Sequence, residues 1–299
     1  MTDPTTIDLN MHGFPGITGA FLVRGSKTAL VETGPKSSLE DLLKGLEDAG
    51  VERLDYVVVT HIHLDHAGAA GTLAARWPDA TVVVHPRGAP HLADPSKLWS
   101  SAARIYGDGM DRMWGGIDPV PEGRIREIHD GESIDLGGAS LRAVETPGHA
   151  RHHHAYLEES TGTVFCGDAL GVRLPDVGVI RPATPPPEFD LEAAIASIGK
   201  VRELGAQRLC FTHFGIRDDE DPEATCNAAV DALVEWAGWV TAAREQTTEV
   251  DAAADFVRTA AASAYGARLD EASVARLEQT TSYWMNTWGY MRYMDKLGS

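Results

Sequence analysis

The stretch Thr60-His-Ile-His-Leu-Asp-His66 is the strongest indication of fold and chemistry in this 299-residue chain. It directly follows residues 54–59, an apolar and largely β-branched run that is typical of a strand buried on both faces. Side chains alternate along extended backbone, so His61 and His63 can point to one side, while Asp65 and His66 follow where the chain must turn. Imidazole and carboxylate donors without cysteine suit Zn, Mn, Fe or Co. The stretch therefore predicts a metal site at the end of a strand.

Outward from this stretch, expected strands and helices alternate along the first two thirds of the chain. Short apolar runs between turn residues indicate strands, and longer runs with helical spacing indicate helices. This alternation favours an α/β architecture. The expected strands cover residues 17–23, 28–32, 54–59, 81–85, 125–128, 139–144, 155–157, 163–166 and 207–212, and the expected helices cover 37–49, 68–76 and 190–204.

The chain changes character after about Phe214. Asp221-Pro222 is typical of a helix start, with a capping aspartate followed by proline at the first helical position. Apolar residues then keep helical spacing through 230–240 and again through 274–291. We therefore predict a catalytic domain over residues 1–215 and a helical C-terminal extension over 216–299 that packs on it.

Three further motifs extend the metal-site pattern: Thr146-Pro-Gly-His149, Gly167-Asp168 after a strand, and Phe211-Thr-His213 at a strand end. With them the chain resembles the metallo-β-lactamase superfamily over roughly residues 7–215. The resemblance implies a four-layer αββα sandwich with the site between its two sheets. It also implies two divalent metal ions, with zinc expected and manganese or iron as alternatives. One ion would be held by His61, His63 and His149, and the second by Asp65, His66 and His213, with Asp168 bridging.

The chemistry implied by this resemblance is hydrolysis. Two divalent cations about 3.5–4 Å apart can share a water molecule and lower its pKa towards neutrality. The resulting bridging hydroxide would attack a carbonyl or phosphoryl centre while one ion holds the developing oxyanion. Asp65 and Asp168 are the expected catalytic residues, because Asp65 would orient the hydroxide and Asp168 would set the separation of the ions. We predict a dinuclear metallo-hydrolase that acts on a small ester, lactone or thioester.

Individual residues favour some branches of the superfamily over others. Glu32-Thr-Gly34 stands where members often carry Asp-Thr-Gly, and Glu32 is expected either to accept a hydrogen bond from a ligand histidine or to be purely structural. Gly171 stands where the lactonase branch has a tyrosine, which weakens an acyl-homoserine lactonase assignment. The glyoxalase II branch shares the ligand set and a helical C-terminal addition, but the sequence shows no convincing basic cluster for the carboxylates of glutathione.

Two other activities stay open at this stage. A phosphodiesterase acting on a small phosphate diester would use the same ligand set. A di-iron oxidoreductase would use the same scaffold, but such proteins normally carry a flavodoxin module, and residues 216–299 are too few and too helical to supply one.

Residues outside the ligand set give the predictions of substrate contacts. Residues 95–119 carry Trp99 and Trp114 in a pattern too irregular for a clean helix or strand. We expect a lid or pocket wall there, with both tryptophans as candidate substrate contacts and with a dimer contact or simple packing as the alternatives. In the run His152-His153-His154, alternation should point His153 opposite to its neighbours, so His153 is a candidate substrate contact, with support of the metal ligands or simple packing as the alternatives for all three. Arg173, in a proline-rich loop, is the candidate for binding a substrate carboxylate.

Composition limits the partners of the chain. There are 26 Lys and Arg against 44 Asp and Glu, which gives a formal charge of −18, and no Lys/Arg run could form a phosphate-binding face. We therefore expect a small-molecule substrate and no nucleic acid. No stretch approaches the ~18 apolar residues of a membrane span. Three scattered cysteines and an N-terminus without a signal pattern predict a cytoplasmic protein. Five aromatic residues within 283–293 predict core packing or an oligomer interface, so a homodimer is one expectation.

Overall fold

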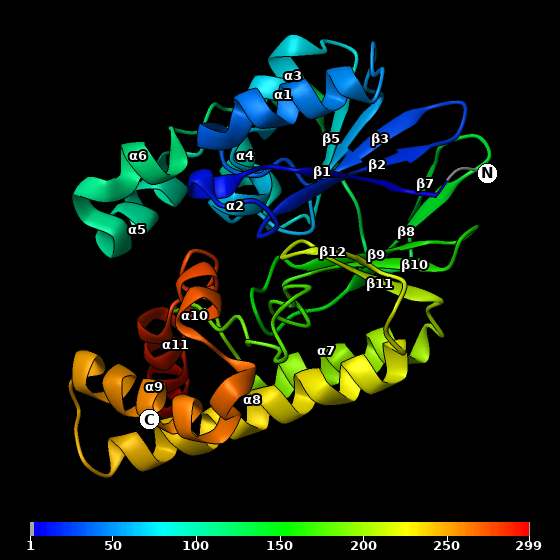
Figure 1. Cartoon of the computed structure of the whole chain (residues 1–299). Helices are drawn as coiled ribbons and strands as arrows, with labels where there is room; N and C mark the ends of the chain where they lie inside the picture. Colours follow the sequence, from blue (N-terminus) through cyan, green and yellow to red (C-terminus); the bar gives the residue numbers. More distant parts are fainter. Residues whose placement is uncertain (1–2, 299) are drawn as a thin grey trace.

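The chain folds into four layers, with two β-sheets face to face and helices on both outer sides (Figure 1). The computed structural model describes residues 3–298. The layers are the αββα sandwich expected from the sequence, and helices follow at the C-terminal end as predicted. The two ends of the chain lie at opposite ends of the molecule (Figure 1).

The first sheet carries the histidine-rich stretch. Its six strands lie in chain order, with β1–β3 paired antiparallel and β3–β6 paired parallel. Because β3, β4 and β5 are parallel, their carboxyl ends meet at one edge, where ligand sites of open α/β sheets form. Glu32 follows β3 and Thr60 follows β4 at this edge. The strands are β1 (Thr5–Asp8), β2 (Gly19–Arg24), β3 (Thr28–Val31), β4 (Tyr56–Val58), β5 (Thr81–Val84) and β6 (Ile125–Glu127).

The second sheet carries the later motifs. Its order is β12-β11-β10-β9-β8-β7, antiparallel throughout except that β10 and β11 run parallel. The parallel pair brings Asp168, after β10, and His213, just beyond β11, to the same edge. The strands are β7 (Ser133–Asp135), β8 (Ser140–Glu145), β9 (His154–Glu158), β10 (Thr163–Gly167), β11 (Arg208–Phe211) and β12 (Gly215–Arg217), and α7 (Leu191–Glu203) joins β10 to β11.

The two sheets are held together by side chains that alternate along each strand. In β4, Val58 packs between the sheets, whereas Val57 packs beneath the outer helices, so both faces of this strand are buried as its sequence predicts. Phe21 and Phe165, one from each sheet, meet with ring centroids 5.7 Å apart. The outer helices on the first sheet are α1 (Leu39–Asp48) and α3 (Ala70–Arg76), followed by α4 (Ala89–Ala93).

Residues 95–119 form a helical hairpin, which corrects the expectation that this segment has no clear helix. Helix α5 (Ser96–Tyr106) is followed by a 3₁₀ turn (Gly107–Gly109) and helix α6 (Met110–Trp114). Gly107 (φ 52°) and Gly115 (φ 70°) end the two helices in conformations that favour glycine. Apolar residues within α5 do follow a helical spacing, but both helices are short and glycines interrupt the pattern between and after them, so it does not continue over the whole segment.

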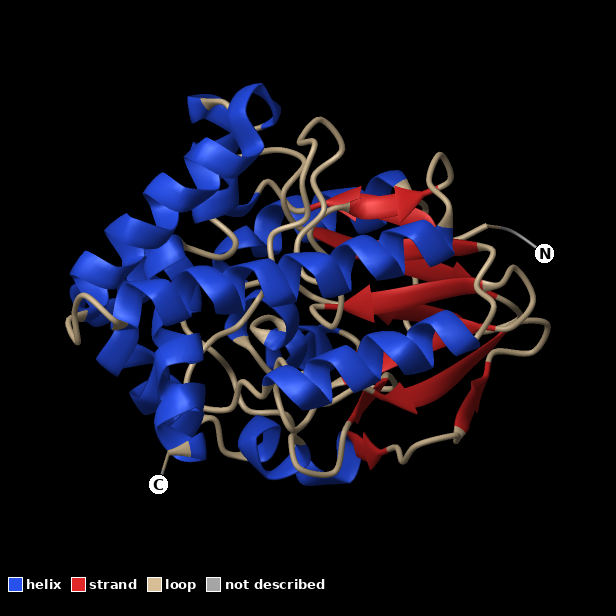
Figure 2. Ribbon diagram, turned by 90° about the horizontal axis from the view of Figure 1, so that it is seen from below, coloured by secondary structure: helices blue, strands red, loops and turns tan. Residues whose placement is uncertain are grey.

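The C-terminal helices pack on the second sheet through one continuous hydrophobic cluster with α7. Figure 2, seen from below, shows helices lying across the strands on this side. Asp221 caps the first of them by accepting a hydrogen bond from the Glu223 backbone N–H, as its sequence predicts. Tyr290 is buried and donates to the Leu233 carbonyl at 2.7 Å. The helices are α8 (Pro222–Arg244), α9 (Val250–Tyr265), α10 (Glu271–Glu278) and α11 (Tyr283–Leu297).

Among the helices of residues 3–298, none combines the length and apolar character required to cross a bilayer.

Candidate metal centre

Three imidazoles converge at the end of β4. His61 and His63 lie in the extended segment between β4 and α2 (Leu64–Ala67), and His149 reaches them from the turn after β8. His61 Nε2 lies 2.9 Å from His63 Nδ1, and His149 Nε2 lies 3.1 Å and 2.9 Å from those two atoms. Three ring nitrogens at such separations, all facing one point, form a group that could hold a metal ion.

A second group lies beside the first. Asp65 and His66 come from α2, and His213 comes from the loop between β11 and β12. The Asp65 Oδ2 atom lies 3.8 Å from His66 Nε2 and 3.5 Å from His213 Nε2. These three donors also lie close enough together to hold an ion.

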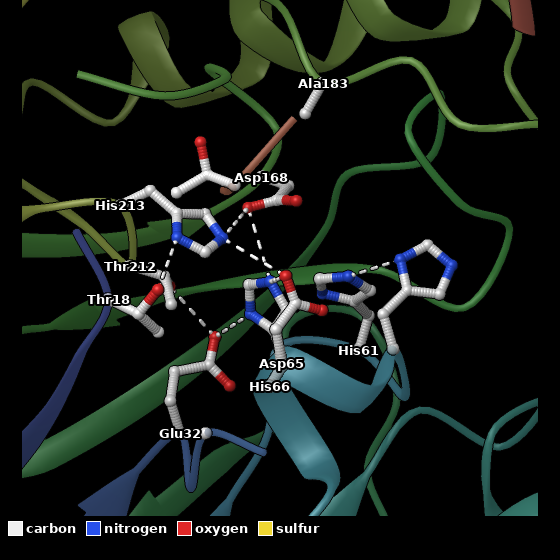
Figure 3. A network of polar contacts seen from close by, with 12 residues as sticks. Thr18, Glu32, His61, Asp65, His66, Asp168, Ala183, Thr212 and His213 are labelled. Carbon is white, nitrogen blue, oxygen red and sulfur yellow. Dashed lines mark hydrogen bonds and ion pairs between the residues drawn. The ribbon is translucent and has the colours of Figure 1, made fainter. Parts of the chain in front are cut away.

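Asp168 faces both groups. Its Oδ1 lies 3.4 Å from His66 Nε2 and 3.6 Å from His213 Nε2, while its Oδ2 lies 3.5 Å from His149 Nε2. The carboxylate therefore presents one oxygen to each group (Figure 3). All seven metal-ligand candidates of the sequence are brought together at this one place: His61, His63, Asp65, His66, His149, Asp168 and His213.

Buried polar atoms that have no hydrogen-bond partner indicate whether these residues are suited to bind a metal ion. His66 Nε2, Asp168 Oδ1 and His213 Nε2 are buried without a hydrogen-bond partner. Buried polar atoms are nearly always paired, so three such atoms facing one another call for a shared partner. The donors are nitrogen and oxygen only, which suits a divalent ion of the Zn, Mn or Fe type. The residues therefore fit the metal that the fold implies.

The electrostatics of the two groups differ. Burial lowers the pKa of His61, of His63 and of His149, which keeps their rings neutral with a free lone pair. Burial would raise the pKa of Asp168, but the facing imidazoles hold it well below its usual value, and the pKa of Asp65 is lowered in the same way. The second group thus has the ionised Asp65 carboxylate and shares that of Asp168, and these buried negative charges favour positive charge there.

The far nitrogens of the rings are held by fixed acceptors (Figure 3). His149 Nδ1–H donates to the Ala183 carbonyl at 2.9 Å, and His213 Nδ1–H donates to the Ile17 carbonyl at 2.9 Å. His66 Nδ1–H donates to Glu32 Oε1 at 3.0 Å. Such contacts fix the orientation of each ring and direct its Nε2 atom at the site. The carboxylates of Asp168 and Asp65 raise the pKa of His66 and of His213, in contrast to that of His149.

Glu32 joins three strand ends at the base of the site. Its carboxylate accepts hydrogen bonds from Thr60 Oγ1 at 2.6 Å and from Thr212 Oγ1 at 3.1 Å as well as from His66. It is fully buried and has a φ of 67°, a left-handed conformation that a non-glycine residue rarely adopts. Of the two roles left open by the sequence, the structure shows the hydrogen-bond acceptor. Thr60, Thr212 and the Ala183 carbonyl were not identified from the sequence, because no local pattern marks them.

A cavity of about 420 Å³ opens over the donor atoms. Its floor includes His63, Asp65, His149 and Asp168. The α5–α6 hairpin forms one wall, which agrees with the expectation of a pocket wall near the metals, and the 185–187 loop with the start of α11 forms the other. Trp114 lines this cavity, as expected of a substrate contact.

Three residues predicted as substrate contacts do not line this cavity: Trp99, Arg173 and His153. Trp99 packs against the cluster of Leu64, Met110 and Trp114 and does not line the cavity. Arg173 lines a separate cavity and pairs with Glu220 at 2.7 Å, so its charge is already neutralised. Arg173 therefore lies outside the cavity over the metal-binding residues, and its role in binding a substrate carboxylate stays a prediction.

His153 is buried behind the donor atoms rather than in the cavity. Its Nδ1–H donates to Thr146 Oγ1 at 2.8 Å, and its Nε2 accepts from the Asp168 backbone N–H at 3.1 Å. It holds the backbone of Asp168 from behind and does not line the cavity, so its role as a substrate contact stays a prediction. Of its neighbours, His152 lines the cavity, and the ring of His154 lies 4.7 Å from that of His85.

Comparison with known proteins gives the family. The sequence profile of the metallo-beta-lactamase superfamily matches residues 13–213. A metallo-beta-lactamase fold-containing protein of Sulfurisphaera tokodaii is 31% identical over 208 residues, which cover 68% of this chain and 75% of that protein. A hydroxyacylglutathione hydrolase of Synechococcus sp. is 29% identical over 150 residues, which cover 50% of this chain and 48% of that protein. The chain thus spans about half the length of that enzyme.

The likeness extends to the C-terminal helices. The crystal structure of an archaeal metallo-beta-lactamase superfamily protein from Sulfolobus tokodaii superposes with a TM-score of 0.71 at 25% identity. The superposition covers 97% of this chain and 98% of that one. The motifs at the strand ends, the four layers and these matches agree: this chain belongs to the metallo-β-lactamase superfamily.

Proposed function

We propose that this chain is a hydrolase that uses two divalent ions, zinc in the first instance, to cleave a small ester, lactone or thioester. The observation that carries the proposal is the position of Asp168. Its two oxygens lie 3.4–3.6 Å from the ring nitrogens of His66, His213 and His149, so one carboxylate faces both donor groups. A carboxylate placed in this way can bind two closely spaced ions at once, one through each oxygen.

Some of these residues would bind the metal ions, and others would orient the attacking water or hold the ligands in place. His61, His63 and His149 would hold one ion, Asp65, His66 and His213 the other, with Asp168 between them. When bound, such a pair supplies an activated water and polarises a substrate carbonyl. Asp65 has its side chain 15% exposed and lines the cavity, so its carboxylate can also accept a hydrogen bond from the attacking water. Glu32 and His153 hold His66 and Asp168 in place.

Two further features of the chain are consistent with this function. The three cysteines are free and buried, which supports the proposed location in the reducing cytoplasm. The homodimer expected from the aromatic C-terminal segment stays a prediction, although Tyr283, Tyr290 and Tyr293 of that segment lie in the core of the single chain.

The test uses the purified full chain, its metal content and a panel of chromogenic esters, lactones and thioesters. We expect chelation to abolish hydrolysis and zinc or manganese to restore it, with close to two ions bound per chain. The double variant His61→Ala/Asp168→Ala should lose both ions and activity. Activity that survives in the double variant would overturn the proposal.

The same panel separates the two alternatives carried from the sequence. A nitrophenyl phosphodiester hydrolysed faster than every carboxylic ester would replace the proposed ester bond by a phosphate diester. Bound iron with substrate-linked oxygen consumption would replace hydrolysis by a di-iron oxidoreductase.

A further inference from the structure

We infer that the cavity accepts substrates with a medium-length apolar acyl chain and at most one negative charge. This inference rests on the proposed hydrolase function, because it assigns the chemical class of substrate to the same site. The evidence for it is the set of residues that form the walls of the cavity, which lie outside the metal-ligand motifs.

One wall is an apolar stripe on α5. Leu98, Ala102, Ile105 and Tyr106 all line the cavity and follow one another at i, i+4, i+7 and i+8. Such a stripe normally packs into the protein core. Here α5 has no fully buried residue. Leu98, Ala102 and Tyr106 pack against the small cluster of Leu64, Met110 and Trp114 and, with Ile105, also leave part of their surface lining the cavity above the metal-binding residues.

The remaining walls extend this apolar surface. Met113 and Trp114 of α6 continue it on the same side, and Tyr106 meets Trp114 edge to face with ring centroids 5.1 Å apart. The three prolines at 185–187 and Met285 of α11 face it from the other side. A chain placed between these walls would be covered by apolar groups on both sides.

The charges along the cavity argue against a polyanionic substrate. Lys97 is the one lysine or arginine among the described residues that line it. The two glutamates of the lining are already engaged: Glu188 accepts from the Arg151 backbone N–H at 3.0 Å, and Glu278 pairs with Arg181 at 2.6 Å. A second substrate carboxylate would leave water without a cationic partner, which costs free energy.

The volume limits the length of the acyl chain. At about 420 Å³ the cavity lies at the lower end of the ~300–1,000 Å³ that is usual for small-molecule sites. Each methylene buried should strengthen binding by about threefold to fourfold. The gain should stop when the chain fills the space, because further methylenes would stay in water.

The first experiment measures chain-length dependence in two ways. The metal-loaded protein hydrolyses nitrophenyl esters from acetate to dodecanoate, and kcat/KM is expected to rise about threefold per methylene and then level off within the series. In parallel, calorimetry measures binding of the corresponding free carboxylic acids to the full chain. A flat series in both measurements would overturn the inference, as would faster hydrolysis of a glutathione thioester or a succinate half-ester than of a hexanoate ester.

A pair of variants on α5 localises the effect. Ala102→Trp places a large side chain in the middle of the stripe, so the ratio of octanoate to acetate hydrolysis should fall at least tenfold. Ser100→Trp is the matched control, because Ser100 is exposed and does not line the cavity. An unchanged ratio in Ala102→Trp would overturn the assignment of this wall.

The outcomes distinguish this inference from the function on which it rests. A metal-loaded protein that hydrolyses no ester, lactone or thioester overturns the proposed function. In that case the calorimetric binding of the free carboxylic acids still tests whether the cavity walls bind an acyl chain. An affinity that does not change with chain length would then overturn the inference as well.

Discussion

The floor and the walls of the cavity are built in opposite ways. The floor consists of polar residues that follow the ends of strands in both sheets, and most of its donor atoms are buried, with three of the rings fixed by hydrogen bonds from behind. The walls consist of helices from two distant parts of the chain, and α5 buries no side chain completely. The comparison indicates that the reaction chemistry depends on the rigid sheet edge, whereas the choice of substrate depends on helices that can change with little effect on the floor.

The largest expected effect comes from removing one ligand of the floor. His61→Ala should lower activity more than about 10³-fold, beyond the loss from removing one charge-stabilising donor, because metal binding itself is lost. Metal analysis and kcat/KM for an acetate ester measure both effects. His129→Ala is the matched control, since His129 is exposed and lies outside the cavity. Equal losses in the two variants would remove the distinction between floor and surface histidines.

A smaller effect is expected from the wall. Trp114 is 5% exposed and packs with Leu64, Met110 and Tyr106, so Trp114→Ala should lower the free energy of unfolding by about 3 kcal/mol and reduce the preference for long acyl chains. Trp99→Ala, in the same cluster but away from the cavity, should leave chain-length preference unchanged. Denaturant unfolding and the ester series measure the two properties. A loss of bound metal in Trp114→Ala would show that floor and wall are not independent.

A further prediction concerns the support beneath the floor. Glu32→Gln should weaken metal binding by about 10–100-fold, because the neutral amide holds His66 less firmly. Competition with a chelator of known affinity measures this change. Glu122→Gln, at an exposed position, serves as the control. Unchanged metal affinity in Glu32→Gln would limit Glu32 to a role in packing.

The smallest expected effect is the pH-dependent contribution of Asp118, at the base of the α5–α6 hairpin, to the free energy of unfolding. Hydrogen bonds from Lys36 (2.8 Å) and Thr72 (2.5 Å) lower the pKa of Asp118. A lowered folded-state pKa means that Asp118 stabilises the fold above its unfolded value of about 3.9 and that this contribution is lost as pH falls through the folded value.

The pair is partly exposed, so Asp118→Asn should cost only about 0.5–1 kcal/mol at pH 7. Urea unfolding of both proteins from pH 7 to pH 2.5 measures the difference, which should shrink towards zero at the acidic end. A difference that grows on acidification would contradict the assigned sign.

Features that depend on neighbouring residues in the chain could be predicted from the sequence, whereas features that depend on distant residues could not. The buried strand at 54–59 and the helix start at Asp221-Pro222 were predicted because their signals are local. The short strands β1, β7 and β12 were not expected, because three or four residues at or near a sheet edge carry little pattern. The ion pair of Arg173 with Glu220 was not predicted, because an arginine in a loop looks free in the sequence until folding places its partner beside it.

The sequence by itself determined the donor set and its position at strand ends, because each motif is a short run whose residue types and flanking strand lie together in the chain. The family resemblance implied that Asp168 lies between the two donor groups, and the tertiary structure supplied its distances of 3.4–3.5 Å to His66 and His149. Only the tertiary structure decided that Glu32 and His153 hold the floor from behind and that an apolar stripe of α5 lines the cavity. The physical reason is that these contacts join residues up to about two hundred positions apart, and the packing of one sheet on the other sets their distances.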